Sequence, residues 1–259
     1  MGVALAHSGL LAWPQHPATG SFAAWHPGVL SAGADLLPYA RIGFDIARFH
    51  PALFDEHAIA MPRAIAHAVP KRQAEFLAGR LCARAALGLY GVSACIASGA
   101  GREPLWPGGF IGSITHDARS AAAIVCPHER FTGIGIDIET IVGVEAGKAL
   151  LTHVICAAEL ELVDAWRGEL ARETLLTIIF SAKESFFKAA YAQVRRFVDF
   201  DALRLTGMDG ATKTLRFCLQ CTLSPDLVKG QAIESSYAWL DANSIITAVA
   251  LTPGRVGPM

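Results

Sequence analysis

One short segment constrains the fold of this chain more than any other. From residue 133 to residue 139 the sequence reads GIGIDIE, in which isoleucine alternates with glycine or an acid. Alternation with a period of two is typical of a β-strand, because successive side chains point to opposite faces. The isoleucines therefore predict a strand with one face against a core. Asp137 and Glu139 then share the other face, about 7 Å apart.

Two carboxylates on one strand face repel each other unless a cation lies between them. Mg²⁺ suits such a site, because it binds one or two protein carboxylates and completes its shell with water and phosphate oxygens. We therefore interpret Asp137 and Glu139 as candidate metal ligands. The alternative is a solvent-facing strand whose acids only keep it soluble, and the segment alone is compatible with both interpretations.

The composition limits the classes of protein to which this chain can belong. With 259 residues and 53% apolar side chains, it is long enough for one large domain, or for two domains of about 100–150 residues. Lys and Arg total 22 against 23 Asp and Glu, so there is no global positive field, and we expect no nucleic-acid partner. Apolar stretches end before about 18 residues, so we expect no membrane span.

The cysteines and the start of the chain favour a cytoplasmic protein. The first Lys or Arg is Arg41, so the start lacks the charged region of a secretory signal. The six cysteines are scattered, and we expect them to be reduced thiols. Cys218 and Cys221 have a metal-like spacing but no second pair, so no zinc site is predicted. The sequence has no P-loop, GxGxxG, GxSxG or HExxH motif. Nucleotide hydrolysis by a Walker site, dinucleotide redox chemistry, serine hydrolysis and zinc peptidase chemistry therefore have no support.

Hydrophobic periodicity predicts an α+β chain. The expected elements are loop and short strand over 1–38, a helix from Pro70 that stops at Gly91, strands at 110–116, 120–126 and 132–140, helices within 143–170 and over 173–193, and strands at 203–207, 214–221, 236–241 and 244–251. Each half offers helix plus antiparallel strands. We therefore predict a pseudo-twofold pair of similar lobes, residues 1–127 and 128–259.

A second group of polar residues lies in the segment FSAKESFFKA, residues 180–189. Apolar residues recur there at helical spacing, which predicts a helix with one buried side. Glu184 and Lys188 then share the opposite side, one turn apart, with Lys183 beside them. Two ammonium groups and one carboxylate are suited to a phosphate and its metal ion. An ordinary surface salt bridge between Glu184 and Lys188 is the alternative.

Further candidate phosphate ligands precede the acidic strand. His116 ends a strand and, beside a polyanion, could act as a charged hydrogen-bond donor. Arg72, Arg80 and Arg84 lie along the helix that begins at Pro70, and the arginine fork matches phosphate oxygens. Alternatively, His116 is structural and the arginines are merely solvated.

The order of these segments resembles a known family. KRQAEFLAGR, REPLWPGGFIGSITH, GIGIDIE and FSAKESFFKA follow one another within residues 70–192. This series is similar to the 4'-phosphopantetheinyl transferases of the type associated with enterobactin synthase. The resemblance implies a pseudo-twofold pair of α+β lobes with coenzyme A in the cleft between them, Mg²⁺ as cofactor, and an apo acyl or peptidyl carrier protein as partner.

The resemblance also implies roles for individual residues. Asp137, Glu139 and Glu184 would bind or surround Mg²⁺. The residues expected at coenzyme A are Lys183 and Lys188 at phosphate oxygens, His116 at a phosphate, Ser113 and Thr115 close to the cofactor, and Arg72, Arg80 and Arg102 at the nucleotide end. In two places the sequence departs from the family pattern: Ile138 stands between the strand acids, and Ser98 stands where some relatives have lysine.

The implied reaction is attack of a carrier serine on the pantetheine-side phosphorus of coenzyme A, with release of 3',5'-ADP. Glu184 is the expected base, assisted by the charges of Asp137, Lys188 and His116. We expect a monomer, because two lobes in one chain supply the whole site. Two alternatives remain: a metal-dependent phosphodiesterase acting on coenzyme A, and a non-catalytic subunit that binds coenzyme A.

Overall fold

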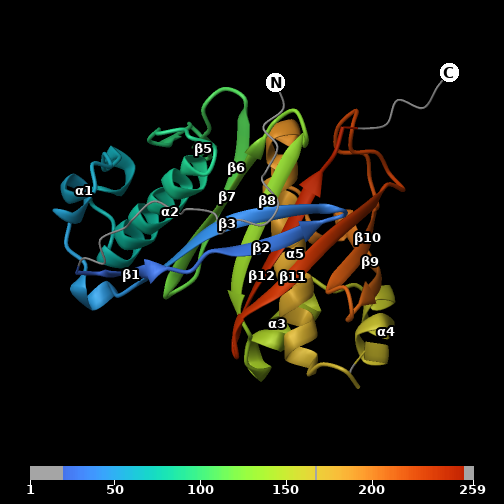
Figure 1. The fold of residues 1–259 in the computed structure, drawn as a ribbon. Helices are drawn as coiled ribbons and strands as arrows, with labels where there is room; N and C mark the ends of the chain where they lie inside the picture. Colours follow the sequence, from blue (N-terminus) through green and yellow to red (C-terminus); the bar gives the residue numbers. More distant parts are fainter. Residues whose placement is uncertain (1–19, 167, 254–259) are drawn as a thin grey trace.

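The computed structural model describes residues 20–166 and 168–253, which form two α/β lobes (Figure 1). The N-terminal lobe contains a sheet with the strand order β1-β3-β7-β6, in which β2 also pairs with β3. Its strands are β1 (Phe22–Trp25), β2 (Gly28–Ala32), β3 (Asp35–Phe44), β6 (Phe110–His116) and β7 (Ser120–Pro127). Helix α2 (Pro70–Gly88) covers this sheet, and the short helix α1 (Leu53–Glu56) lies beyond α2.

The C-terminal lobe contains an antiparallel sheet with the order β8-β12-β11-β10-β9. Its strands are β8 (Gly133–Thr140), β9 (Leu203–Asp209), β10 (Thr214–Leu219), β11 (Ala232–Asp241) and β12 (Ser244–Leu251). Helix α5 (Arg172–Val194) packs on β8 and β12. Two shorter helices, α3 (Val144–His153) and α4 (Ala157–Trp166), lie against α5. A small two-stranded sheet, β4 (Ala97–Ser98) and β5 (Pro104–Leu105), belongs to the loop after α2.

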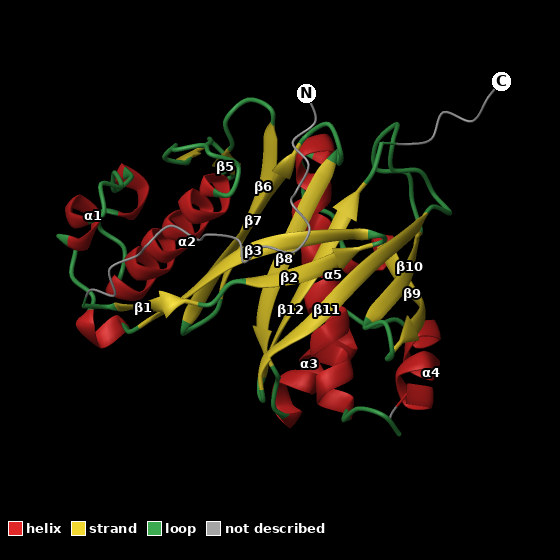
Figure 2. Ribbon diagram, in the orientation of Figure 1, coloured by secondary structure: helices red, strands yellow, loops and turns green. Residues whose placement is uncertain are grey.

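The two sheets lie between the two long helices, so the molecule has a central core as well as one core in each lobe (Figure 2). Strand β7 contributes to two of them. Its residues Ala121, Ala123 and Val125 face the α2 side, whereas Ala122 and Ile124 face the second sheet. The isoleucines of β8 pack into the same central core. Each lobe therefore buries one sheet face against its helix and part of the other against its neighbour.

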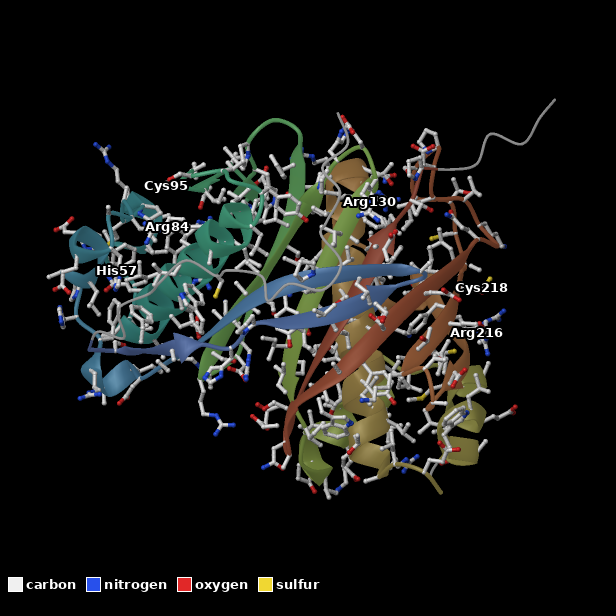
Figure 3. The ribbon with its side chains drawn as sticks, viewed as in Figure 1. His57, Arg84, Cys95, Arg130, Arg216 and Cys218 are labelled. Atoms are coloured by element: carbon white, nitrogen blue, oxygen red, sulfur yellow. The ribbon has the colours of Figure 1, made fainter. Side chains whose placement is uncertain are left out.

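The chain crosses from one lobe to the other between β7 and β8. Arg130 in this connection pairs with Asp35, which lies at the turn between β2 and β3 (Figure 3 labels Arg130). The β2 strand also contacts the second sheet, where the Ser236 hydroxyl donates to the backbone carbonyl of Ser31. The N-terminal hairpin thus takes part in joining the lobes.

Most of the predicted elements are confirmed. The helix from Pro70, the hairpin of β6 and β7, the acidic strand β8, the long helix α5 and the last four strands all form near the expected residues. The mixed α/β class with two antiparallel sheet lobes is confirmed as well. The helical region over 143–170 is two helices, because the chain breaks at residues 154–156.

The prediction for the N-terminal segment contained fewer strands than the structure has. Residues 1–38 were expected to be loop and short strand, and residues 1–19 lie outside the described part of the chain. The structure places β1, β2 and the first part of β3 within residues 22–38. Leu30 and Leu37 from these strands are buried in the central core, so this segment contributes to the fold.

Within the described residues, no helix is both long and apolar enough to cross a membrane.

Glycines in β8 allow helix α5 to approach the strand closely. A Cβ at Gly135 would lie 1.9 Å from the carbonyl oxygen of Ser185, and one at Gly133 would lie 2.1 Å from that of Ala189. Both partners are helix backbone, which cannot move aside as a flexible side chain can. The spacing between β8 and α5 therefore requires glycine at both positions.

We predict that Gly135→Ala lowers the free energy of unfolding by about 1–3 kcal/mol, the usual cost of overpacking a well-packed core. Gly147→Ala is the matched control. Its Cβ would meet Glu173 and Leu176 at an ordinary 3.7 Å, and alanine favours the helix, so stability should stay equal or rise. Urea denaturation measures both variants. Equal stability of the two would contradict the close-packing explanation.

Candidate active site

Asp137 lies at the point where strand β8, helix α5 and strand β6 meet. The residue is 6% exposed, and its carboxylate accepts hydrogen bonds from three side chains. The donors are Lys188 Nζ at 2.6 Å, Ser181 Oγ at 2.9 Å and Thr115 Oγ1 at 3.2 Å. The alternation of β8 is as predicted, with the isoleucines on the opposite face. The acidic face is not solvent-facing at this residue, because α5 covers it.

Two hydroxyls of β6 connect the lobes beside Asp137. Ser113 Oγ accepts the backbone N–H of Ile136 at 3.1 Å, and Thr115 Oγ1 accepts that of Ile138 at 3.1 Å. These N–H groups lie on the edge of β8 that has no strand partner. The two hydroxyl oxygens therefore accept the hydrogen bonds that a neighbouring strand would otherwise accept. Ser113 and Thr115 were expected close to the cofactor. The structure assigns their hydroxyls to β8, and Ser113 also lines a cleft described below.

The charge of Asp137 acts on two further carboxylates, Glu139 and Glu184. Burial, followed by the charge of Asp137, raises the pKa of Glu139 to about 7. Burial and Asp137 also raise the pKa of Glu184. Lys188 opposes both shifts, because a nearby cation favours the ionised carboxylate. Across residues 20–166 and 168–253, no group of three His, Cys, Asp or Glu side chains converges closely enough to hold a metal ion in the present conformation.

Lys188 extends from α5 toward the β8 backbone. Its ammonium group donates to Asp137 and to the carbonyl of Ile136 at 3.0 Å. The salt bridge of Lys188 is therefore with Asp137 at the junction of the lobes. This geometry argues against the alternative of a simple surface pair between Glu184 and Lys188.

The structure corrects the prediction for Lys183. This side chain is 1% exposed and lies on a different side of α5 from Lys188. Its ammonium group bonds Glu159, with the shortest N···O distance 2.9 Å, and the carbonyls of Val154 and Phe200. Glu159 in turn accepts the backbone N–H groups of Cys156 and Leu205. Lys183 therefore ties α5 to α4 and β9, and its charge does not face the cleft.

A cleft of about 440 Å³ adjoins these groups on the N-terminal lobe. Arg72, Arg80, Arg102 and His116 all line it. Arg80 is 7% exposed, donates to Ser98 Oγ at 2.8 Å and lies 4.5 Å from the centre of the Phe76 ring. Burial, with help from Arg72, lowers the pKa of Arg80 to about 10, so the guanidinium stays charged at neutral pH. The three arginines therefore meet in one pocket.

Arg84 belongs to the other side of α2. It donates to the backbone carbonyl of His57, and Figure 3 shows both residues in the N-terminal lobe near α1. Because this contact turns the side chain away from the cleft, Arg84 is not a candidate phosphate ligand.

His116 has a different hydrogen-bonding role from the one expected. Arg72 Nη1 lies 3.0 Å from His116 Nε2. Since a guanidinium group can only donate, Nε2 accepts this bond and the ring is neutral. Burial lowers the pKa of His116, which also favours the neutral ring, although the charge of Glu75 opposes this shift. Glu75 is itself buried and lies 3.8 Å from His116 Nδ1. The charged donor predicted from the sequence is therefore a neutral histidine in this structure.

A second cleft, of about 320 Å³, adjoins the first. Both are lined by Arg102, Pro104 and Ile114. The second cleft also contains Lys188, with the aromatic side chains of Phe187 and Tyr191 on α5. Two larger cavities, of about 630 and 550 Å³, lie elsewhere and share no lining residue with these two clefts.

Several cleft residues were not predicted from the sequence. Glu75, Glu103, Phe187 and Tyr191 line the two clefts. Phe187 precedes Lys188 in the sequence and Tyr191 lies three residues after it, so helical spacing could have placed both on the same side of the helix as Lys188. Glu103 bonds Arg195 at 3.0 Å across the lobes, and no sequence pattern indicates this pair.

Comparison with known proteins agrees with this geometry. Residues 60–126 match the model of the 4'-phosphopantetheinyl transferase N-terminal domain, and residues 133–240 match that of the 4'-phosphopantetheinyl transferase superfamily. Enterobactin synthase component D of Escherichia coli (strain K12) is 39% identical over 172 residues, which cover 64% of this chain and 80% of that protein. The chain belongs to the 4'-phosphopantetheinyl transferase family.

Other members are similar over comparable lengths. 4'-Phosphopantetheinyl transferase PptT of Mycobacterium tuberculosis is 32% identical over 193 residues, which cover 72% of this chain and 82% of the relative. 4'-Phosphopantetheinyl transferase Npt of Nocardia iowensis is 34% identical over 182 residues, which cover 69% and 74% of the two chains. The matched regions include α2, the loop that carries Arg102, the β6–β7 hairpin, β8 and α5, which contribute the candidate residues discussed above.

The raised pKa of Glu139 gives a stability prediction for this transferase. When folding raises the pKa of a carboxyl group, the protonated group stabilises the folded state. This stabilisation is complete at pH values below the pKa in the unfolded chain, and it is lost as the pH rises through the pKa in the folded protein. In divalent-free buffer, Glu139→Gln should therefore raise the melting temperature at about pH 8. We expect about 2–4 °C, the shift for roughly 1 kcal/mol after allowance for partial solvent screening. Near pH 4, below the ordinary pKa of 4.5 for this carboxyl, the difference should disappear.

The exposed Glu161 on α4 provides the control. Glu161→Gln should change the melting temperature equally at both pH values, because this side chain is exposed. Differential scanning calorimetry gives all four values. A Glu139→Gln effect independent of pH would show that this carboxylate is not strained by burial and by Asp137.

Proposed function

We propose that this chain transfers the 4'-phosphopantetheine group of coenzyme A to a serine of an apo carrier protein, in the presence of Mg²⁺. One observation carries the proposal. The charge of Asp137 acts on Glu139 and Glu184, and Asp137 bonds Lys188. Lys188 lines one of two clefts that share Arg102, and Arg72 and Arg80 line the other. A substrate with a pyrophosphate in its centre and a phosphorylated nucleotide at one end matches this distribution of charge.

The donor set fits a hard divalent cation. The three acids offer carboxylate oxygens alone, and the raised pKa values of Glu139 and Glu184 arise from burial and from like charge that a cation would relieve. Asp137, Glu139 and Glu184 would hold the ion. When bound, Mg²⁺ would neutralise charge on the phosphoryl oxygens.

The cleft residues divide between binding and reaction. Arg80 and Arg102 line the cleft on the N-terminal lobe, and we assign to them the phosphorylated nucleotide. Lys188 lines the neighbouring cleft and carries positive charge to the reacting phosphoryl group. Arg72 would bind a phosphate through its guanidinium group, which the neutral ring of His116 holds in place.

The reaction forms a bond between the carrier serine oxygen and the pantetheine-side phosphorus. The bond from that phosphorus to the bridging oxygen breaks, and 3',5'-ADP leaves with the electron pair. Glu184 accepts the serine proton. Burial and Asp137 raise its pKa, which makes this carboxylate a stronger base.

Carrier identity, location and assembly complete the proposal. The likeness to enterobactin synthase component D suggests an acyl or peptidyl carrier of nonribosomal peptide or siderophore synthesis. All six cysteines lie in the described residues as free thiols, which suits the cytoplasm. Both lobes of one chain supply the site, so a monomer is sufficient.

The test is mass spectrometry of apo carrier proteins after incubation with this protein, coenzyme A and Mg²⁺. We expect one phosphopantetheine group per carrier serine, and no modification of a Ser→Ala carrier. EDTA should reduce the rate at least about a hundredfold, and added Mg²⁺ should restore it. Release of free phosphopantetheine without a carrier would favour the phosphodiesterase alternative, which the related proteins do not support. Coenzyme A binding without transfer to any carrier would contradict the proposal.

A further inference from the structure

Three buried hydroxyl groups form a chain beneath Asp137. Ser181 Oγ lies 2.9 Å from Asp137 Oδ2, and Thr247 Oγ1 lies 2.9 Å from Ser181 Oγ. Ser185 Oγ lies 2.7 Å from Thr247 Oγ1. Ser181, Ser185 and Thr247 are all 0% exposed. The chain runs from α5 to β12 and back to α5, and ends on the carboxylate of β8.

The hydrogen bonds of this chain have one direction. A carboxylate only accepts, so Ser181 donates to Asp137. Ser181 has one hydroxyl proton, so it accepts from Thr247. Thr247 has then used its own proton, so the 2.7 Å contact with Ser185 requires Ser185 to donate. The Ser185 hydroxyl also has a longer alternative acceptor, the backbone carbonyl of Thr247 at 3.2 Å. All three dipoles therefore point toward the negative charge of Asp137, and hydrogen bonds in such a series strengthen one another.

The direction matters because Ser181 has a competing acceptor. Its hydroxyl also lies 3.3 Å from the backbone carbonyl of Asp137. Donation from Thr247 polarises Ser181 and favours the stronger bond to the carboxylate. The other carboxylate oxygen binds Lys188 and Thr115. With both oxygens held, the plane of the Asp137 carboxylate is fixed.

We propose that Thr247 is a positioning residue, which acts through Ser181 to hold Asp137 in the orientation required for the divalent ion. This inference rests on the proposed function. Thr247 lies on β12, beyond residues 133–240 that match the superfamily model, and it touches none of the clefts described above. Partners of metal ligands typically change metal affinity or activity about 10- to 100-fold when they are removed.

A purely structural role makes a different prediction, and a matched residue separates the two. Ser235 on β11 is also 0% exposed and donates to the carbonyl of Ala248 at 3.0 Å, but it has no link to Asp137. If the hydroxyls only stabilise the fold, loss of Thr247 or of Ser235 should lower the melting temperature and leave metal binding unchanged.

The experiment measures Mn²⁺ binding by electron paramagnetic resonance, together with the Mg²⁺ dependence of carrier modification. Thr247→Val, which keeps the shape and removes the hydroxyl, should weaken Mn²⁺ binding about tenfold. Ser181→Ala should weaken it at least as much. Thr247→Ser keeps the hydroxyl, so its Mn²⁺ affinity should stay within about twofold of the wild-type affinity. Ser235→Ala should bind Mn²⁺ with the wild-type affinity.

Ser185 supplies the control within the chain of hydroxyls. In Ser185→Ala, Thr247 still donates to Ser181, so Mn²⁺ binding should change less than in Thr247→Val. If Thr247→Val does not fold, the comparison of Ser181→Ala with Ser185→Ala decides, and equal affinities in those two variants overturn the proposal. Wild-type-like binding by folded Thr247→Val also overturns it, while active wild-type protein leaves the proposed function intact. A wild-type protein that binds no divalent ion would overturn both.

Discussion

The close approach of helix α5 to strand β8 is the contact on which the rest of the site depends. Glycines at 133 and 135 leave room for the helix backbone, and Asp137 then meets Ser181 and Lys188 on the facing side of α5. A buried carboxylate costs folding free energy unless hydrogen bonds replace its lost water. Asp137 receives them from α5 and β6, so one residue joins both lobes.

The lobes contribute opposite charges to the site. The N-terminal lobe supplies arginines in the loop and helix that line one cleft, and the C-terminal lobe supplies the three carboxylates and Lys188. The hydroxyls of Ser113 and Thr115 join the two lobes, because they accept backbone N–H groups on the unpaired edge of β8. A phosphate-rich substrate can therefore contact cations from both lobes at once.

The sequence predicts the elements with strong periodicity and fails where contacts are distant. The alternation in β8 and the helical spacing around Glu184 were sufficient to predict the strand and the helix that bring Asp137 close to Glu139 and Glu184. Strand β3 was missed because Pro38 interrupts it, and proline usually argues against a paired strand. Lys183 was misplaced because its partner Glu159 lies 24 residues away on another helix. The role of Thr247 is equally nonlocal, since its hydroxyl meets α5 only in the folded chain.

The most direct test of this explanation is anomalous diffraction from crystals of the protein grown with coenzyme A and Mn²⁺. We expect one strong manganese peak within bonding distance of Asp137, Glu139 and Glu184. The coenzyme A phosphates should lie between that peak and Arg80. A manganese peak in one of the two larger cavities, or coenzyme A bound there, would contradict the assignment of the site to the junction of the lobes.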